Sequence, residues 1–116
     1  GQVVSARLVY ETQKQLSVPA QAVIMIANQA FVYKIVDAEE ALKLIENRQD
    51  ADPTQIKKIK GYPKNTLIAV ETPIKLGPLT QDSYPLIEGL ESGSKVAISQ
   101  TRFLVTGTAV NIRGEE

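Results

Sequence analysis

Short apolar runs rich in Val, Ile and Leu recur along this chain, separated by polar connectors and, from Gly61 onward, mostly by glycine or proline. Such runs are typical of β-strands, because β-branched side chains fit a pleated sheet while Gly and Pro favour turns. Several short strands at regular spacing predict a mainly β fold, an antiparallel β-roll or barrel, and not a parallel α/β sheet. The predicted strands are residues 3–10, 16–18, 22–27, 31–36, 67–71, 74–76, 83–87, 95–99 and 109–112, with 22–27 and 31–36 forming a hairpin.

The segment at about 37–64 has the pattern of a small two-helix insertion between strands. Asp37 is followed three residues later by Glu40, which is the spacing of a helix-capping box. Asp52 is followed by a proline, which suits the start of a second helix, and Gly61 is a suitable stop. The apolar residues on the expected helical faces are Ala38, Ala41, Leu42 and Ile45 in the first helix, and Ile56 and Ile59 in the second.

Length and composition restrict the class of protein. The 116 residues suffice for one compact domain, or for one domain with a remnant of a neighbour. Thirteen basic residues balance thirteen acidic ones, which gives no electrostatic basis for binding nucleic acid or anionic lipid. No apolar run approaches the roughly 20 residues that a membrane-spanning helix needs. Because the chain starts at Gly1 and not at Met, we expect it to be a fragment of a longer protein.

Nucleophilic catalysis has little support in the sequence. The absence of His and Cys excludes Ser-His-Asp and Cys-His arrangements. Ser92, Ser94 and Lys95 are close enough in sequence for a Ser–Lys pair, but serines in a turn beside a surface lysine are far commoner. Gly89 and Gly93 precede a strand and not a helix, so they lack the helix N-terminus that would hold a phosphate. We therefore predict that the chain is not an enzyme.

Paired carboxylates raise the question of a metal site. Glu39 and Glu40 are neighbours on a predicted helix, so they point in different directions and belong to a solvated face and a cap. Asp50 and Asp52 resemble the start of a calcium loop, but the Gly and the closing Glu of an EF-hand are missing. A further pair stands at residues 115–116. We predict no metal site and no cofactor.

The basic cluster Lys57-Lys58-Ile59-Lys60 is the strongest candidate for partner binding. Without interleaved aromatic residues, it has the pattern of a solvated helix face. Tyr62 and Lys64 beside it would extend the cluster into a docking patch. The candidate docking residues are Lys57, Lys58, Lys60 and Tyr62. The alternative, that the insertion simply covers an open end of the β-roll with its apolar residues, remains open at this point.

Several segments together resemble one known family. Residues 89–96 place a turn with two glycines before a strand, and residues 18–23 open an earlier strand with a proline. Their sequences are Gly89-Leu90-Glu91-Ser92-Gly93-Ser94-Lys95-Val96 and Val18-Pro19-Ala20-Gln21-Ala22-Val23, and companion segments stand at 31–36, 72–77 and 108–112. In this order they resemble the C-terminal part of the periplasmic adaptor subunits, or membrane fusion proteins, of tripartite efflux pumps.

The resemblance implies a domain organisation and a set of partners. Residues 1–18 would be the last strand of a preceding β-barrel domain with its connector, and residues 19–116 a membrane-proximal β-roll domain. The insertion at 37–64 departs from the family, which usually has a tight turn there. Family adaptors are non-catalytic and periplasmic, and they form a ring. The resemblance thus implies docking on an inner-membrane transporter, of the resistance-nodulation-division or ABC type, and coupling to an outer-membrane channel.

A β-barrel ligand- or carbohydrate-binding module of an unrelated protein is the alternative function. Such modules usually display aromatic side chains together on one exposed face. A cluster of several aromatic residues on one surface of the fold would therefore favour this alternative over the adaptor. The available residues are Tyr10, Tyr33, Tyr62, Tyr84, Phe31 and Phe103.

Overall fold

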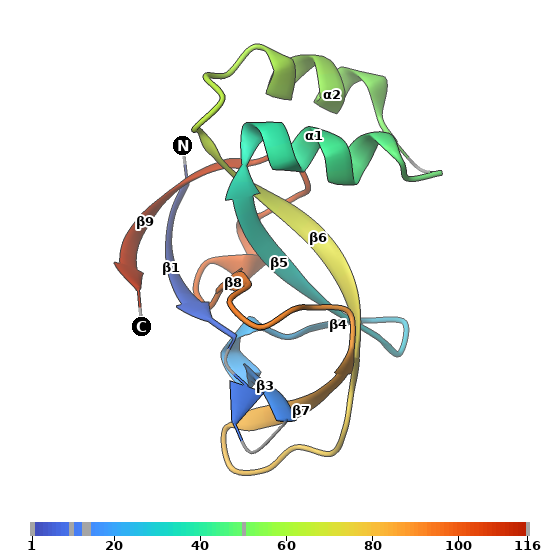
Figure 1. Ribbon diagram of the computed structural model, residues 1–116, viewed down its shortest axis with the longest axis vertical. Coiled ribbons are helices and arrows are strands. Elements are labelled where there is room, and N and C mark those ends of the chain that lie inside the picture. Colours follow the sequence, from blue (N-terminus) through green and yellow to red (C-terminus); the bar gives the residue numbers. More distant parts are fainter. Residues whose placement is uncertain (1, 10, 13–14, 50, 116) are drawn as a thin grey trace.

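The computed structural model describes residues 2–9, 11–12, 15–49 and 51–115, and it places two helices at one end of a curved sheet (Figure 1). The strands are β1 (Gln2–Leu8), β2 (Glu11–Thr12), β3 (Gln15–Pro19), β4 (Ile24–Ile26), β5 (Gln29–Asp37), β6 (Leu67–Leu76), β7 (Ser83–Glu88), β8 (Lys95–Ala97) and β9 (Ala109–Glu115). The helices are α1 (Ala38–Glu46) and α2 (Pro53–Lys60), with short 3-10 helices η1 (Ala20–Ala22) and η2 (Thr101–Phe103). The prediction of a mainly β fold with a two-helix insertion is confirmed.

The strands pair in the order β2–β3–β7–β6–β9–β1–β8–β5–β4, and β5 also pairs with β6. Because β5 pairs with both β6 and β8, the strand pairings form a closed circuit through β5, β6, β9, β1 and β8. Neighbours run antiparallel, as predicted, except β1 and β9, which run parallel. The long pairing of β5 with β6 extends from Ala30 opposite Ile74 to Asp37 opposite Leu67. These two strands carry the helices at one end and the β4–β5 turn at the other (Figure 1).

Aliphatic side chains fill the interior, as the composition requires. In β1 the alternate residues Val4 and Ala6 are buried, and Val9 just after the strand is buried too, while Tyr10, the last residue of the predicted strand, lies outside the described residues. Val4 and Ala6 pack in one cluster with Tyr33, Ile35, Ala69, Ala97, Leu104 and Val110. β1 thus shares its core with later strands. The domain boundary at residue 18, between a preceding β-barrel domain and the membrane-proximal β-roll domain, stays a prediction about the longer protein.

Both helices begin, and α2 ends, where the sequence predicts. The Asp37 side chain caps α1 by accepting a hydrogen bond from the backbone N–H of Glu40 at 2.8 Å. Asp52 caps α2 by accepting one from the N–H of Thr54 at 2.9 Å. Gly61 occupies the C-cap position of α2. These caps satisfy backbone donors that the first turn of each helix would otherwise leave unpaired.

The inner faces of the helices cover one part of the sheet. Ile45 of α1 and Ile59 of α2 are almost fully buried, and they pack over Ile68 and Val70 of β6. Leu42 and Ile56, also predicted on the apolar faces, are half-buried at the edge of this cluster. The interpretation of the insertion as a cover is supported by this packing. Whether the outer face of the helices docks on a partner stays a prediction.

The predicted strands at 67–71 and 74–76 form one continuous strand. β6 continues through Pro73, because a proline removes one ladder hydrogen bond without changing the extended backbone. The disturbance appears instead as a register shift between Lys75 and Leu76, where β7 joins. The sequence pattern of residues 101–105 fits either a helical turn or a strand, and the structure has the helical turn η2 at Thr101–Phe103, followed by extended backbone at Leu104.

Tyr33 of β5 makes a buried polar contact between two parts of the core. Its hydroxyl donates a hydrogen bond to the carbonyl oxygen of Leu104 at 2.7 Å, and the Oε2 atom of Glu71 lies 3.4 Å away. Burial, followed by the negative charge of Glu71, raises the pKa of Tyr33 above its ordinary value. This bond holds the segment after η2 against β5.

We expect Tyr33→Phe to lower the free energy of unfolding by about 1–2 kcal/mol at neutral pH, because the carbonyl of Leu104 loses its partner. The folded pKa of Tyr33 is raised, so the unfolded state loses its phenolic proton first. The stability that Tyr33 contributes is therefore present below about pH 10 and is lost as the pH rises through the folded pKa.

Urea unfolding of both proteins from neutral pH to above about pH 10 measures this effect. The stability difference between wild type and variant should shrink as the pH rises; a constant difference would contradict the argument. Tyr84→Phe is the control, because Tyr84 is half-buried and its hydroxyl has no hydrogen bond within the described part of the chain.

Candidate functional site

The predicted docking residues lie at the end of the molecule that the helices occupy (Figure 1). Lys57, Lys58 and Lys60 are exposed on α2, and Tyr62 follows the helix as a half-buried residue. Tyr62 packs at the edge of the cluster formed by the helices and β6. The structure therefore places the four predicted residues in and just after α2, with the three lysines exposed and the tyrosine half-buried.

Local energetics explains part of this lysine pattern. The lysines are in the last turns of α2, where cations interact favourably with the negative end of the helix dipole. Ile59 lies between them in sequence but is only 1% exposed, so it anchors the helix while its neighbours face solvent. Lys60 Nζ lies 3.8 Å from Glu46 Oε1, and both side chains are exposed, so the pair contributes little stability.

A pocket of about 360 Å³ opens between α1 and the segment that follows α2. Ala38 and Ile59 form buried parts of its wall, and Leu42 and Tyr62 are half-buried beside them. The exposed members of its lining are Glu39, Lys60 and Lys64. The sequence pattern identified the lysines and Tyr62. It assigned Leu42 to the core and Glu39 to a helix surface, so their place in this pocket was missed.

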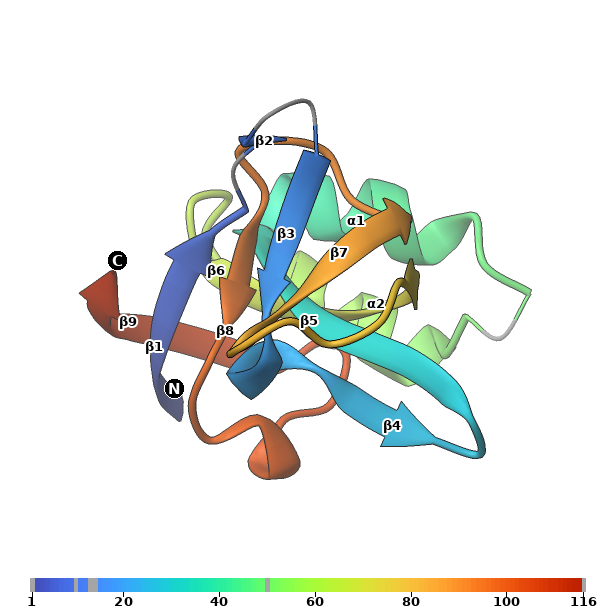
Figure 2. The same cartoon turned by 90° about the horizontal axis from the view of Figure 1, so that it is seen from below.

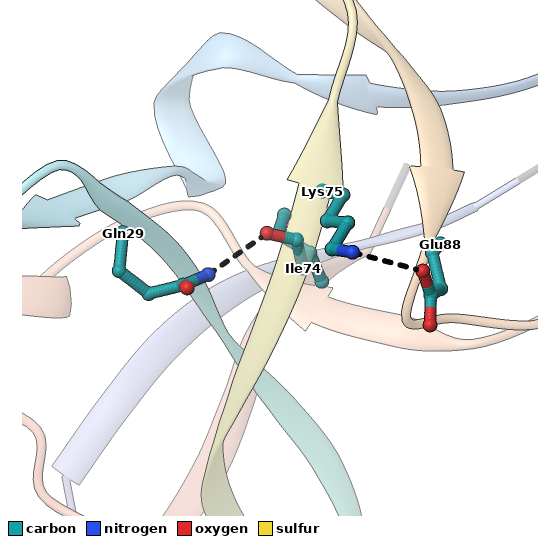
Figure 3. Close-up of polar contacts among 4 residues, drawn as sticks. All are labelled: Gln29, Ile74, Lys75 and Glu88. Atoms are coloured by element: carbon teal, nitrogen blue, oxygen red, sulfur yellow. Dashed lines mark hydrogen bonds and ion pairs between the residues drawn. The ribbon is translucent and has the colours of Figure 1, made fainter.

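A second hollow lies between the β4–β5 turn and the β6–β7 strands, with a volume of about 570 Å³. Met25 and Ile87 line it and are 60% and 67% exposed. At this end of β6, the Gln29 side chain donates a hydrogen bond to the carbonyl of Ile74 at 3.0 Å (Figure 3). On the other side of β6, Lys75 Nζ lies 3.5 Å from Glu88 Oε2. No pattern in the sequence indicated this hollow.

The glycine-containing turn before β8 has a structural role. The N–H of Val9 donates to the carbonyl of Ser94 at 2.8 Å, and the N–H of Gly93 donates to the carbonyl of Val9 at 2.7 Å. The Ser94 hydroxyl accepts a bond from the N–H of Glu91 at 3.3 Å and is buried in the turn. The turn therefore ties the end of β1 to the start of β8, and Ser94 is engaged within it.

The carboxylates and aromatic residues are dispersed. Asp50 and Glu116 lie outside the described residues, and within the described ranges no group of three or more potential metal ligands converges. Tyr33 is buried, whereas Phe103 is 59% exposed, with the Arg102 guanidinium 5.2 Å from its ring centre. Phe31, Tyr62 and Tyr84 line three different pockets.

No helix within the described ranges has the length and apolar character needed to cross a membrane. Neither a protein-family model nor a curated protein sequence matches this chain.

The outer face of the helix pair, with the pocket beside it, is the candidate functional site because charge, an apolar wall and exposure coincide there.

Proposed function

We propose that this chain is the membrane-proximal part of a periplasmic adaptor. In this role it is a non-catalytic protein that docks on an inner-membrane efflux transporter and helps to couple it to an outer-membrane channel. The transporter is of the resistance-nodulation-division or the ABC type, and the full-length adaptor assembles into a ring. The helix pair at residues 37–64 forms part of the docking surface.

The helix pair carries the proposal. Its inner face packs on β5 and β6, the long strand pair, so it is held on a rigid support. Its outer face offers Lys57, Lys58 and Lys60, which the fold does not bury. A docking surface requires both properties, a fixed position and side chains left free for the partner.

The sequence of the glycine turn is the main basis of the family resemblance. Residues 89–96 resemble the most recognisable segment of the adaptors, and here they form the turn that joins β1 to β8. The alternative binding module has weaker support, because the described aromatic residues do not gather on one exposed face. We therefore favour the adaptor.

Site-specific photo-crosslinking in inner membranes tests this proposal. A photoreactive residue in place of Lys57, introduced into the full-length protein, is expected to capture a polytopic transporter. The matched control replaces Leu79, which is 52% exposed in the loop between β6 and β7 at the opposite end of the molecule (Figure 1). Capture of soluble proteins alone from both positions would remove the adaptor function.

A further inference from the structure

We propose that the pocket between α1 and the segment after α2 receives one large apolar side chain from an acidic segment of the partner. This inference rests on the proposed function and specifies the chemistry that the docking surface recognises. The juxtaposition that carries it is an apolar wall, formed by Ala38, Leu42, Ile59 and Tyr62, beneath an exposed rim with two lysines.

The pocket is suited to an anchoring side chain. Its volume of about 360 Å³ is near the lower end of the range of roughly 300–1,000 Å³ that is usual for small-ligand pockets. A pocket of this size accommodates a single aromatic or large aliphatic group, but it is too small for a helix. Such anchors, buried in a pocket and surrounded by a polar rim, carry most of the energy of a typical interface.

The charges at the rim select the flanking residues of the partner. Lys60 and Lys64 stand beside Glu39 in the pocket lining, and Lys60 also lies 3.8 Å from Glu46 Oε1. Lys57, Lys58 and Lys64 have no ion-pair partner within the part of the chain that the structure describes. Carboxylates on either side of the anchor would complement this surplus of positive charge. Such complementarity contributes mainly to specificity and to the rate of association.

A peptide titration followed by side-chain NMR tests the inference directly. The probe is acetyl-Asp-Glu-Phe-Glu-Asp-amide, and the readouts are the methyl signals of Leu42 and the ring signals of Tyr62. The methyl signal of Met25 serves as an internal control, because Met25 lines the second hollow and not this pocket. We expect saturable shifts at Leu42 and Tyr62, with the Met25 signal unchanged.

Two changes to the peptide and two to the protein make the test specific. Replacing the Phe of the peptide with Ser should weaken binding at least about tenfold, and replacing its acidic residues with lysines should abolish it. Lys64→Glu should weaken binding at least about threefold. Lys75→Glu, an equal change of charge on an exposed lysine outside the pocket, should alter it less than twofold.

The outcomes separate this inference from the proposed function. Equal shifts with the Ser peptide, shifts at Met25, or no shifts at all would overturn the pocket as an anchor site. If that happened while the Lys57 crosslink still captured a transporter, the docking function would stand and only its proposed chemistry would fall. If the peptide bound as expected but the crosslink captured soluble proteins alone, the anchor site would stand without the adaptor function.

Discussion

Gly89→Ala is expected to lower the free energy of unfolding by about 3 kcal/mol or more. Gly89 has φ of +123°, a conformation that side chains strongly disfavour. A Cβ atom there would also lie 2.8 Å from the carbonyl oxygen of Pro73 and 2.8 Å from Cγ2 of Ile74. Because Pro73 and Ile74 belong to the central strand β6, the clash cannot be relieved by a small movement of a surface side chain.

Gly93→Ala provides the matched control for this substitution. Gly93 also has a positive φ, of +89°, but a Cβ added there would meet no heavy atom within 4 Å. Its expected cost is the backbone term alone, about 1–2 kcal/mol. Chemical denaturation of both variants measures the difference. Equal losses for the two variants would show that close packing against β6 does not determine the requirement for glycine at position 89.

Ile45→Ala is expected to lower the free energy of unfolding by about 3–4 kcal/mol. Ile45 is 2% exposed and belongs to the cluster that joins both helices to Ile68 and Val70. Its truncation leaves a cavity that the helix backbone cannot easily fill. Lys43→Ala is the control on the same helix, because Lys43 is exposed, and it should change stability by less than about 0.5 kcal/mol.

Thermal or urea unfolding distinguishes these two variants. A loss below about 1 kcal/mol for Ile45→Ala would mean that the helix pair contributes little to the core.

The same packing affects the design of functional tests. Deleting the helices would uncover Ile68 and Val70, so loss of transporter binding would then be indistinguishable from loss of folding. Substitutions on the outer face avoid this problem.

Local signals in the sequence predicted the helices well. Asp37, Asp52 and Gly61 act through hydrogen bonds and backbone conformations within a few residues, so their effect is visible in the sequence itself. The β4–β5 hairpin was also predicted, but its turn was placed about one residue too late. The turn residues are Ala27 and Asn28, both with positive φ, and Ala27 is an unusual residue for that conformation.

Long-range pairing was beyond local patterns. The register and parallel direction of β1 and β9 depend on residues nearly the whole chain apart, and neither strand contains a signal for its neighbour. The candidate site was only partly predicted, because it too depends on residues that are far apart in the sequence. Four residues in or just after one short helix were recognisable by composition, whereas the pocket needs Leu42 and Glu39, which α1 brings to them only in the folded state.

The parallel pairing of β1 with β9 also determines how the fold bears mechanical load. Gln2 lies opposite Val110, while Ala6 lies opposite Glu115 at the other end of the pair. A force that pulls Gln2 and Glu115 apart therefore acts along both strands in opposite directions. The ladder bonds between the strands are then sheared together instead of being opened one at a time. The fold should resist such tension far better than a hairpin pulled from its open end.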